Sequence, residues 1–495
     1  MLRLPLFLSL TVSCSVLMAQ QVPPGVSGLP HYERVPCTQS FSAEDRAECG
    51  LLTVRENRSH PQSRFIRLPV VIFHGPANSP RDAVLFMTGG PGLSSVANLH
   101  SARDNIFVLD RDYVVLEQRG ARRAQPSLEC PELAGPKTEI HAGRLRGVEA
   151  RQVLAQAARA CRTRLVSEGA DLSGYTTAAT AADIEDLRKA FGYERWDLYG
   201  ISYSTRLMLT YARDYPSGVR SMLLDSVLPL EVNFEEMSAS NLIRSLDQVF
   251  DQCAVTPACV RDNGDVRRKF FELVKRAEKN PLPLAIAPAD AGGKPARIQG
   301  AEVVNAIYSG LHSVRTIPEL PAIIAEAYDG KYDRLTPLAK STLGDGSAFS
   351  WGLRYSIWCS EEFPFENRKL IEQQVSPEFG FGGADLGTLP PEVCDAWNVP
   401  PSKALENQPV TSDAPTLIFA GEFDPDTPPL WGQQLLGSLT HAYFLEFRGR
   451  SHTGGFFRCG QEMAAEFFRH PEKTPSMDCA LGLRGADFGS TVPKN

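Results

Sequence analysis

The sequence lacks the features that would indicate a nucleic-acid partner, a membrane span or a metal site. It has no block of lysines or arginines and carries a net charge of −7, which argues against nucleic acid as a partner. After the N-terminal segment, no stretch has the ~20 apolar residues that a membrane-spanning helix needs. Cysteines and histidines do not occur at the Cys-x-x-Cys or His-x-x-x-His spacings of metal sites. No part of the sequence indicates a cofactor.

The N-terminal segment has the form of a secretory signal. Residues 1–19 carry one early cation, Arg3, then an apolar stretch, and end at the small residue Ala19. Cleavage there predicts a secreted or periplasmic protein. A lipoprotein signal acylated at Cys14 is the alternative, but the apolar stretch continues past this cysteine, which argues against it. Residues 20–36, which begin with a segment rich in Pro, Gly and Gln, are predicted to be flexible.

The cysteine count supports export. Without Cys14 ten cysteines are left, an even number, and each lies near another in the sequence. Because exported proteins favour disulfides, we expect five local bridges rather than scattered buried thiols. The most economical pairs are Cys37 with Cys49, Cys130 with Cys161, Cys253 with Cys259, Cys359 with Cys394, and Cys459 with Cys479.

Short apolar runs alternate with amphipathic segments over much of the chain. Residues 51–56 and 64–73 are predicted to be two antiparallel strands at the edge of a larger sheet. Later runs are mostly apolar, and residues 83–87 are apolar throughout, which is typical of strands buried on both faces of a parallel sheet. These runs are residues 83–87, 113–120, 195–199, 219–225, 415–420 and 442–447. The alternation predicts an α/β fold with a mostly parallel, doubly wound sheet.

Helical periodicity dominates between residues 230 and 409, for example over residues 234–250 and 300–311. Because predicted strands precede and follow this stretch, we expect it to be a helical cap inserted into the sheet domain. The predicted organisation is therefore a core formed by residues 37–229 and 410–495, with the cap, residues 230–409, between its two parts.

A candidate nucleophile lies where a predicted strand meets a helix. Trp196–Ile201 is an apolar run and residues 207–213 have helical spacing, so Ser202 lies at the corner between them. Gly200 and Ser204 are small enough to permit a sharp turn. Such a nucleophile elbow lifts the serine hydroxyl clear of the sheet and directs the free N–H groups of the next helix at its target.

A histidine and an acid follow late strands, as a serine hydrolase requires. His452 lies in a glycine-flanked loop after the last predicted strand, and the loop after the preceding strand carries Glu422, Asp424 and Asp426. The hydroxyl of Ser202 needs a base to take its proton, which is the role expected for His452, and an acid must orient the imidazole. Spacing favours Asp424 and leaves Asp426 open. The chain order Ser, Asp, His is that of α/β-hydrolases.

A glycine turn is a candidate for the oxyanion hole. The strand predicted at residues 83–87 breaks into Thr88-Gly-Gly-Pro-Gly92, which turns sharply and exposes its amide groups. We expect the N–H groups of Gly90 and of Tyr203, the residue after the nucleophile, to bind the oxyanion formed during attack. From turn chemistry alone, the loop could equally be a simple chain reversal.

Several short motifs spread along the chain carry a family resemblance. They are Gly89-Gly-Pro-Gly92, Asp183-x-x-Asp-Leu-Arg188, Gly200-x-Ser-Tyr203, Leu224-Asp225, Tyr355-Ser-Ile-x-Cys359-x-Glu361 and Gly421-x-x-Asp-Pro-x-Thr-Pro428. In combination they resemble the secreted prolyl and tripeptidyl aminopeptidase family of serine peptidases, over about residues 37–479. The resemblance implies an α/β-hydrolase with a helical cap that removes residues from peptide N-termini. It implies Ser202 as the nucleophile and His452 as the base, with Asp424 rather than Asp426 as the acid.

Three positions depart from the pattern of that family. Ser204 stands where a glycine is usual, Thr88 replaces a common histidine before the glycine turn, and the surroundings of His452 lack the common Gly-His-Gly. A small residue at position 204 still permits the elbow. The departures bear on the substrate class rather than on the fold or the triad.

An aminopeptidase must also bind a protonated α-amino group, for which a carboxylate of the cap is the expected partner. Glu361 and Glu362, next to Cys359, are the candidates. Glutamates are more often solvated surface residues, which is the alternative at these positions.

Three functions are compatible with these features. The first is a secreted serine exopeptidase acting on peptide N-termini. The second is a carboxylesterase acting on small esters, because the same triad cleaves esters and a fold does not determine a substrate. The third is a non-catalytic binding protein that uses the cap cleft, against which the complete set of serine, acid, histidine and oxyanion loop argues.

Overall fold

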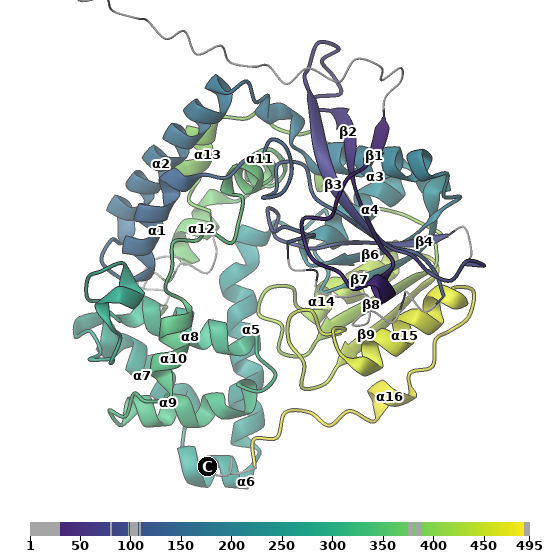
Figure 1. The fold of residues 1–495 in the computed structure, drawn as a ribbon. Helices are drawn as coiled ribbons and strands as arrows, with labels where there is room; N and C mark the ends of the chain where they lie inside the picture. The colour runs from purple at the N-terminus through teal and green to yellow at the C-terminus, as the bar shows by residue number, and fades with distance from the viewer. Residues whose placement is uncertain are drawn as a thin grey trace, which may run out of the picture.

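The structure is a computed structural model, in which a sheet with its helices occupies one side and a group of helices the other (Figure 1). The predicted signal sequence, residues 1–19, lies outside the described residues. The residues described are 30–79, 82–97, 99, 107, 110–374, 380–381, 384 and 389–489.

The described residues form a nine-stranded sheet in the order β1-β2-β3-β5-β4-β6-β7-β8-β9. In this spatial order, neighbouring strands pair antiparallel as far as β3 with β5, and all later pairs, from β5 with β4 to β8 with β9, are parallel. The strands are β1 (His31–Arg34), β2 (Ala47–Arg55), β3 (Phe65–Phe73), β4 (Ala83–Met87), β5 (Tyr113–Leu116), β6 (Trp196–Ile201), β7 (Val219–Asp225), β8 (Thr416–Gly421) and β9 (Ala442–Phe447). The predicted, mostly parallel sheet with an antiparallel edge is confirmed. Strands β4, β5, β6 and β8 are buried throughout, which explains their mostly apolar sequences.

Helices cover both faces of this sheet. Helices α3 (Thr177–Phe191) and α4 (Tyr203–Asp214) pack on one face, where Leu187 lies in a buried cluster with strand residues. Helix α15 (Arg458–Arg469) covers the other face, where Phe467 lies in a second cluster. The C-terminal part also contains α14 (Pro429–Gln434) and α16 (Asp478–Leu481). This is the doubly wound arrangement that the sequence predicts.

The first strand differs from the sequence prediction. Residues 31–34, which belong to the segment 20–36 predicted to be flexible, pair with β2 in antiparallel register. The ring of Tyr32 lies 4.4 Å from that of Phe191 between centroids, and its hydroxyl donates to Glu48. Backbone hydrogen bonds to the edge of a sheet order this part of the segment, and its composition gives no sign of that partner.

The chain between β7 and β8 forms a helical insertion. Its helices are α5 (Phe234–Ala254), α6 (Pro257–Asn263), α7 (Val266–Lys279), α8 (Gly300–Leu311), α9 (Leu320–Tyr328), α10 (Leu335–Ser341), α11 (Trp351–Glu361), α12 (Arg368–Gln374) and α13 (Pro391–Trp397). Leu246, Phe270 and Ile307 belong to a core cluster within it. The insertion occupies the stretch, residues 230–409, for which the sequence predicts a cap. In the described part of the chain, no helix is both long enough and apolar enough to span a bilayer.

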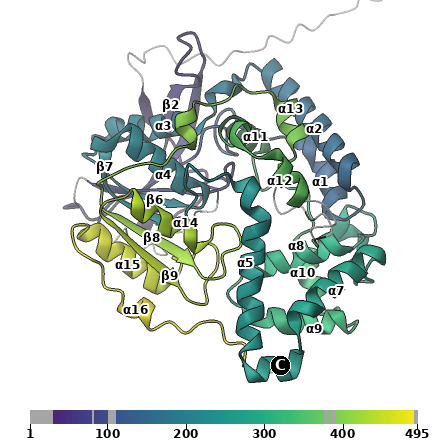
Figure 2. The same ribbon diagram turned by 180° about the vertical axis from the view of Figure 1, so that it is seen from behind.

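Two helices that precede the insertion in sequence pack together with it. They are α1 (Ala134–His141) and α2 (Gly147–Ser167), and α2 lies beside α13 in both views (Figures 1 and 2), while Lys137 of α1 lies over the ring of Trp351 in α11. Leu154 of α2 shares a buried cluster with Trp358 of α11. The helical part of the molecule therefore includes a segment of residues 37–229 as well as the insertion.

All five expected disulfides are present. They are Cys37–Cys49, Cys130–Cys161, Cys253–Cys259, Cys359–Cys394 and Cys459–Cys479. Cys359–Cys394 joins α11 to α13, so it fixes the two helices that pack against α2. Five disulfides favour an extracellular or periplasmic location.

Candidate active site

Ser202 lies at the corner between β6 and α4, where the sequence predicts the elbow. Its backbone has φ 55° and ψ −129°, a conformation that side-chain-bearing residues rarely adopt. The N–H of Ser202 donates to the carbonyl of Asp225 at 3.0 Å, and the carbonyl of Ser202 accepts from Thr205 at 2.9 Å. A strained backbone held in this way is the geometry of a nucleophile elbow.

Ser204, at the position where a glycine is usual, stabilises the elbow through its hydroxyl. The Oγ accepts from the N–H of Ile201 at 2.8 Å and donates to the carbonyl of Met87 at 2.6 Å. The side chain is completely buried, so both contacts are shielded from water. The serine at position 204 therefore links the elbow to β4, the strand that leads into the glycine turn.

The glycine turn lies against the elbow. A Cβ on Gly89 would lie 2.7 Å from the Cβ of Ser202, so this close approach requires glycine. Gly90 has φ 116°, and its carbonyl accepts a hydrogen bond from Arg354 of α11 at 2.7 Å. The structure thus places Gly89, the neighbour of the predicted donor Gly90, against the elbow that carries Tyr203. Sequence reasoning did not identify the roles of Gly89 and Arg354.

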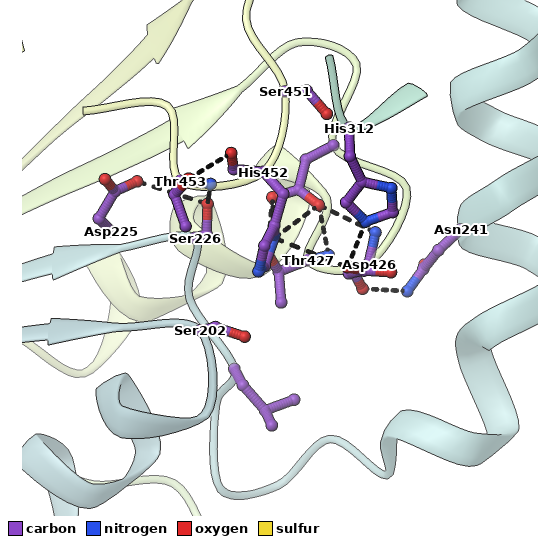
Figure 3. Close-up of polar contacts among 12 residues, drawn as sticks. Ser202, Asp225, Ser226, Asn241, His312, Asp426, Thr427, Ser451, His452 and Thr453 are labelled. Carbon is purple, nitrogen blue, oxygen red and sulfur yellow. Dashed lines mark hydrogen bonds and ion pairs between the residues drawn. The ribbon is translucent and has the colours of Figure 1, made fainter. Parts of the chain in front are cut away.

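His452 and Asp424 form a hydrogen-bonded pair in the loops after β9 and β8. The Nδ1 of His452 lies 2.9 and 3.1 Å from the two carboxylate oxygens of Asp424. Asp426 is farther away, with its nearest oxygen 3.9 Å from the same nitrogen. Figure 3 shows Ser202 facing the His452 ring from the β6 side. Of the two acids that spacing left open, Asp424 is therefore the one that hydrogen bonds the histidine.

Asp424 is buried among hydrogen-bond donors. One carboxylate oxygen accepts from the N–H groups of Asp426 and Thr427 at 2.9 Å each, and the other accepts from the Thr427 hydroxyl at 2.7 Å. Burial alone would raise the pKa of this carboxyl, but His452 and the backbone donors hold the pKa below its usual value. Asp424 is thus kept as an anion. Thr427 belongs to the Asp-Pro-x-Thr-Pro motif, but the sequence assigned it no role.

The side chain of His452 is 16% exposed, and its pKa is perturbed. Burial by itself lowers the pKa of the imidazole, but the negative charges of Asp424, Asp426 and Asp225 outweigh it and raise the pKa to about 9. A histidine with an elevated pKa holds its proton to higher pH, so it acts as a general base only once the pH has risen toward that value.

Residues at the end of β7 anchor the loop that carries His452. The N–H of Thr453 donates to the Ser226 hydroxyl at 2.7 Å, and the N–H of Gly455 donates to Asp225 at 2.9 Å. Burial raises the pKa of Asp225 to about 7. The Leu-Asp motif at this strand end therefore supports the histidine loop.

The helical insertion directly contacts the loop after β8 that carries Asp424 and Asp426, here called the acid loop. Asn241 and Arg244 of α5 donate to the backbone carbonyls of Asp426 and Asp424 at 2.8 and 2.6 Å, respectively. His312, at the end of α8, contacts the side chain of Asp426. These three residues are part of the site and were not predicted, because nothing in their local sequence distinguishes them.

Two family models match the chain. Residues 82–267 match a model described as alpha/beta hydrolase fold, and residues 382–479 match one described as TAP-like protein. The first range includes Ser202, and the second includes Asp424 and His452.

Curated relatives are similar at low identity. Serine protease Hip1 of Mycobacterium tuberculosis (strain H37Rv) is 24% identical over 459 residues, which cover 85% of each chain. Tripeptidyl aminopeptidase of Streptomyces lividans is 28% identical over 205 residues, covering 39% of this chain and 37% of that one. The chain is an α/β-hydrolase enzyme that is similar to serine peptidases.

The relatives include a further peptidase. A probable proline iminopeptidase of Streptomyces coelicolor is 32% identical over 139 residues, covering 28% of this chain and 31% of that one. The solved structure of a proline iminopeptidase from Mycobacterium smegmatis is 14% identical and covers 85% of this chain and 98% of that one, with a TM-score of 0.36. At that score the structural likeness adds nothing to the argument.

In this α/β-hydrolase, Glu361 and Glu362 lie in the interior at the end of α11, with 1% and 0% of their surface exposed. The two oxygens of Glu361 accept from the N–H and hydroxyl of Thr177 at 2.6 and 2.5 Å, and that hydroxyl also contacts the Tyr203 hydroxyl. Glu362 pairs with Arg206 and accepts a backbone N–H. Burial raises the pKa of Glu361 to about 7. Both carboxylates thus have protein donors on every oxygen, whereas a substrate amine needs an accessible carboxylate.

Two groups of side chains in the described residues have ligand atoms close enough for a metal. Cys130 and Cys161, near Glu132, are disulfide-bonded and so are not available. The other group is Asp424, Asp426 and His452 of the α/β-hydrolase site. Its atoms hydrogen bond to one another and to neighbouring side chains, which favours proton transfer over metal binding.

Proposed function

We propose that this α/β-hydrolase is an exported aminopeptidase that releases an N-terminal amino acid, such as proline, or a tripeptide from peptides. The observation that carries the proposal is the hydrogen bond from His452 to Asp424 beside a strained Ser202. The names of two relatives, tripeptidyl aminopeptidase and probable proline iminopeptidase, support the substrate class.

The proposed mechanism proceeds through an acyl-enzyme. The Oγ of Ser202 attacks the carbonyl carbon while the Nε2 of His452 takes its proton, and Asp424 stabilises the resulting imidazolium. The N–H groups of Gly90 and Tyr203 bind the oxyanion. His452 then protonates the leaving amine, so that the C–N bond breaks and the acyl group remains on the serine. Water, activated by the same histidine, hydrolyses the ester and restores the enzyme.

We further propose that residues 230–409 form the cap of a core built from residues 37–229 and 410–495. Support comes from the contacts of α5 and α8 with the acid loop. The cap would limit access to short or N-terminal peptide segments. Export would follow from the signal sequence, residues 1–19, with cleavage rather than acylation at Cys14.

A carboxylesterase is the second candidate. The observation that favours it is the engagement of Glu361 and Glu362 inside the protein, which leaves the expected amine-binding carboxylate unassigned. The same nucleophile, base and oxyanion hole would hydrolyse a small ester.

A matched substrate panel tests the proposal. The mature protein is assayed on free-amine aminoacyl and tripeptidyl anilides, on their N-blocked forms and on short-chain aryl esters, with Ser202→Ala as the blank. Turnover of free-amine anilides with little turnover of blocked forms is the expected result, and the longest anilide accepted gives the number of residues released. Turnover of esters alone would overturn the peptidase proposal in favour of the esterase.

A further inference from the structure

A second acid–histidine pair lies beside the triad. The Nε2 of His312 is 2.9 Å from a carboxylate oxygen of Asp426, and the hydroxyl of Tyr308 donates to the other oxygen. Figure 3 shows the His312 side chain reaching from the helical insertion to the acid loop, next to His452. The ring centroids of His312 and His452 are 6.1 Å apart.

The contacts of His312 require a doubly protonated ring. Its Nδ1 lies 3.0 Å from the backbone carbonyl oxygen of Tyr308, and its Nε2 lies against the carboxylate of Asp426. A carbonyl oxygen and an ionised carboxylate can only accept, so both ring nitrogens of His312 must donate. A third of the His312 side chain is exposed; its partial burial by itself lowers the pKa, but Asp426 outweighs this and raises the pKa above its usual value. The pair is therefore an imidazolium and a carboxylate.

Asp426 on its own would compete with Asp424. Its nearer oxygen lies 3.9 Å from the Nδ1 of His452, the atom that must donate to Asp424. A small rotation of the Asp426 side chain would bring it into hydrogen-bond range. The hydrogen bonds from Tyr308 and His312 occupy both of its oxygens and prevent that rotation.

The balance of charge leads to the same conclusion. With His452 neutral, the cluster of Asp424, Asp426 and His312 carries one net negative charge, and protonation of His452 during attack brings the cluster to neutrality. Without the positive charge of His312, two carboxylates would face His452. The base would then hold its proton to higher pH and be inactive over more of the neutral range.

We propose that His312 is a positioning residue of the catalytic site, supplied by the helical insertion to neutralise Asp426 and keep the Nδ1–H of His452 on Asp424. The inference rests on the proposed roles of Ser202 and His452 but not on the identity of the substrate. In this proposal His452 can act as a base only while the helical insertion packs against the acid loop.

The groups that face these side chains set the size of the expected effect. His452 faces Asp424, Asp426 and Asp225 besides His312, and Tyr308 and Asp426 are the titratable side chains that bond His312. Loss of one charge at a ring about 6 Å away changes the pKa of a partly shielded group by about one to two pH units. We therefore expect a shift of at least about one unit.

The experiment compares His312→Gln, Asp426→Asn and the double variant with the wild-type chain. The readout is the rate constant for covalent modification of Ser202 by phenylmethylsulfonyl fluoride between pH 5 and 10, which needs no substrate. Ser202→Ala is the blank for labelling elsewhere. His441→Gln, at an exposed position before β9, is the matched control for replacing a histidine by glutamine.

We expect His312→Gln to move the midpoint of the acid limb upward by about one unit and to slow labelling at pH 7 about tenfold. Asp426→Asn should move the midpoint downward, and the double variant should return it close to the wild-type value. His441→Gln should leave it unchanged.

The proposal would be overturned if His312→Gln lowered the rate by the same factor at every pH and Asp426→Asn did not restore it. His312 would then be a packing residue. Circular dichroism checks that each variant is folded. If His312→Gln does not fold, Asp426→Asn decides alone, and an unchanged midpoint in that variant would overturn the proposal. Labelling of Ser202→Ala at the wild-type rate would instead show that the catalytic assignment itself is wrong.

Discussion

The guanidinium of Arg354 donates to the carbonyl oxygen of Gly90 at 2.7 Å. Arg354 is 8% exposed, and its guanidinium carbon lies 5.3 Å from the ring centroid of Phe349 and 5.1 Å from that of Trp358. Such aromatic neighbours hold a cation in place. A residue of the helical insertion thus supports the glycine turn whose N–H we propose to bind the oxyanion.

Replacing Arg354 should slow every substrate class alike. In Arg354→Met the Gly90 carbonyl loses its donor and the turn is no longer held in position, so we expect kcat to fall about tenfold with little change in KM. Steady-state kinetics on an anilide and an aryl ester would measure it. Arg458→Met, at a side chain that is 90% exposed, is the matched control. An effect confined to one substrate class would instead assign Arg354 to substrate binding.

The two aspartates of the acid loop should differ in their effect on turnover. Asp424→Asn removes the carboxylate that hydrogen bonds His452 at 2.9 Å, so kcat should fall about 10,000-fold as the wrong tautomer is favoured. Asp426→Asn should retain most of the activity at the pH optimum. A greater loss in Asp426→Asn than in Asp424→Asn would reverse the assignment of the triad acid.

The pH dependence of kcat/KM follows from His452. Its pKa is raised to about 9, so the proton is held to higher pH than in an ordinary histidine, and the neutral base appears only as the pH rises through that value. Activity should therefore rise with pH, with a midpoint well above 6.5. An N-blocked ester is the substrate of choice, because a free α-amino group titrates near pH 8 and would distort the profile. A midpoint at or below 6.5 would contradict the expectation.

Glu361→Gln distinguishes a structural role from substrate binding. The carboxylate accepts two hydrogen bonds from Thr177, so we expect the variant to lose about 1–3 kcal/mol of unfolding free energy. Turnover of free-amine and N-blocked substrates should fall by the same factor. The hypothesis that Glu361 binds the substrate amine requires a selective loss on free-amine substrates, and kinetics on both classes decide between the two.

Disulfides that close longer loops should contribute more stability. Cys359–Cys394 spans 35 residues and Cys253–Cys259 spans 6. The entropy lost by the unfolded chain predicts contributions of about 4 and about 2 kcal/mol, respectively. Unfolding of the two Cys→Ala double variants in guanidinium chloride would measure the difference. A larger loss for the short loop would show that local packing, not loop closure, governs these bridges.

The strand-to-helix corner at Ser202 was predictable because its signal is local. Ser202 follows an apolar strand run and precedes a helical one, and both patterns lie within residues 196–213. The disulfides were predictable for a similar reason, since each cysteine lies within 35 residues of its partner. In contrast, His31–Arg34 pairs with β2 through its backbone, and the composition of the segment gives no sign of such a partner.

The amino-acid sequence by itself determined the α/β class, the order of nucleophile, acid and histidine, and the disulfide pairs, because periodicity, turn chemistry and spacing are properties of neighbouring residues. Only the tertiary structure decided which side chains complete the site. His312 and Asp426 are 114 positions apart, Glu361 and Thr177 184, and Arg354 and Gly90 264. Contacts at such separations depend on how the insertion packs on the sheet domain, which no local pattern encodes.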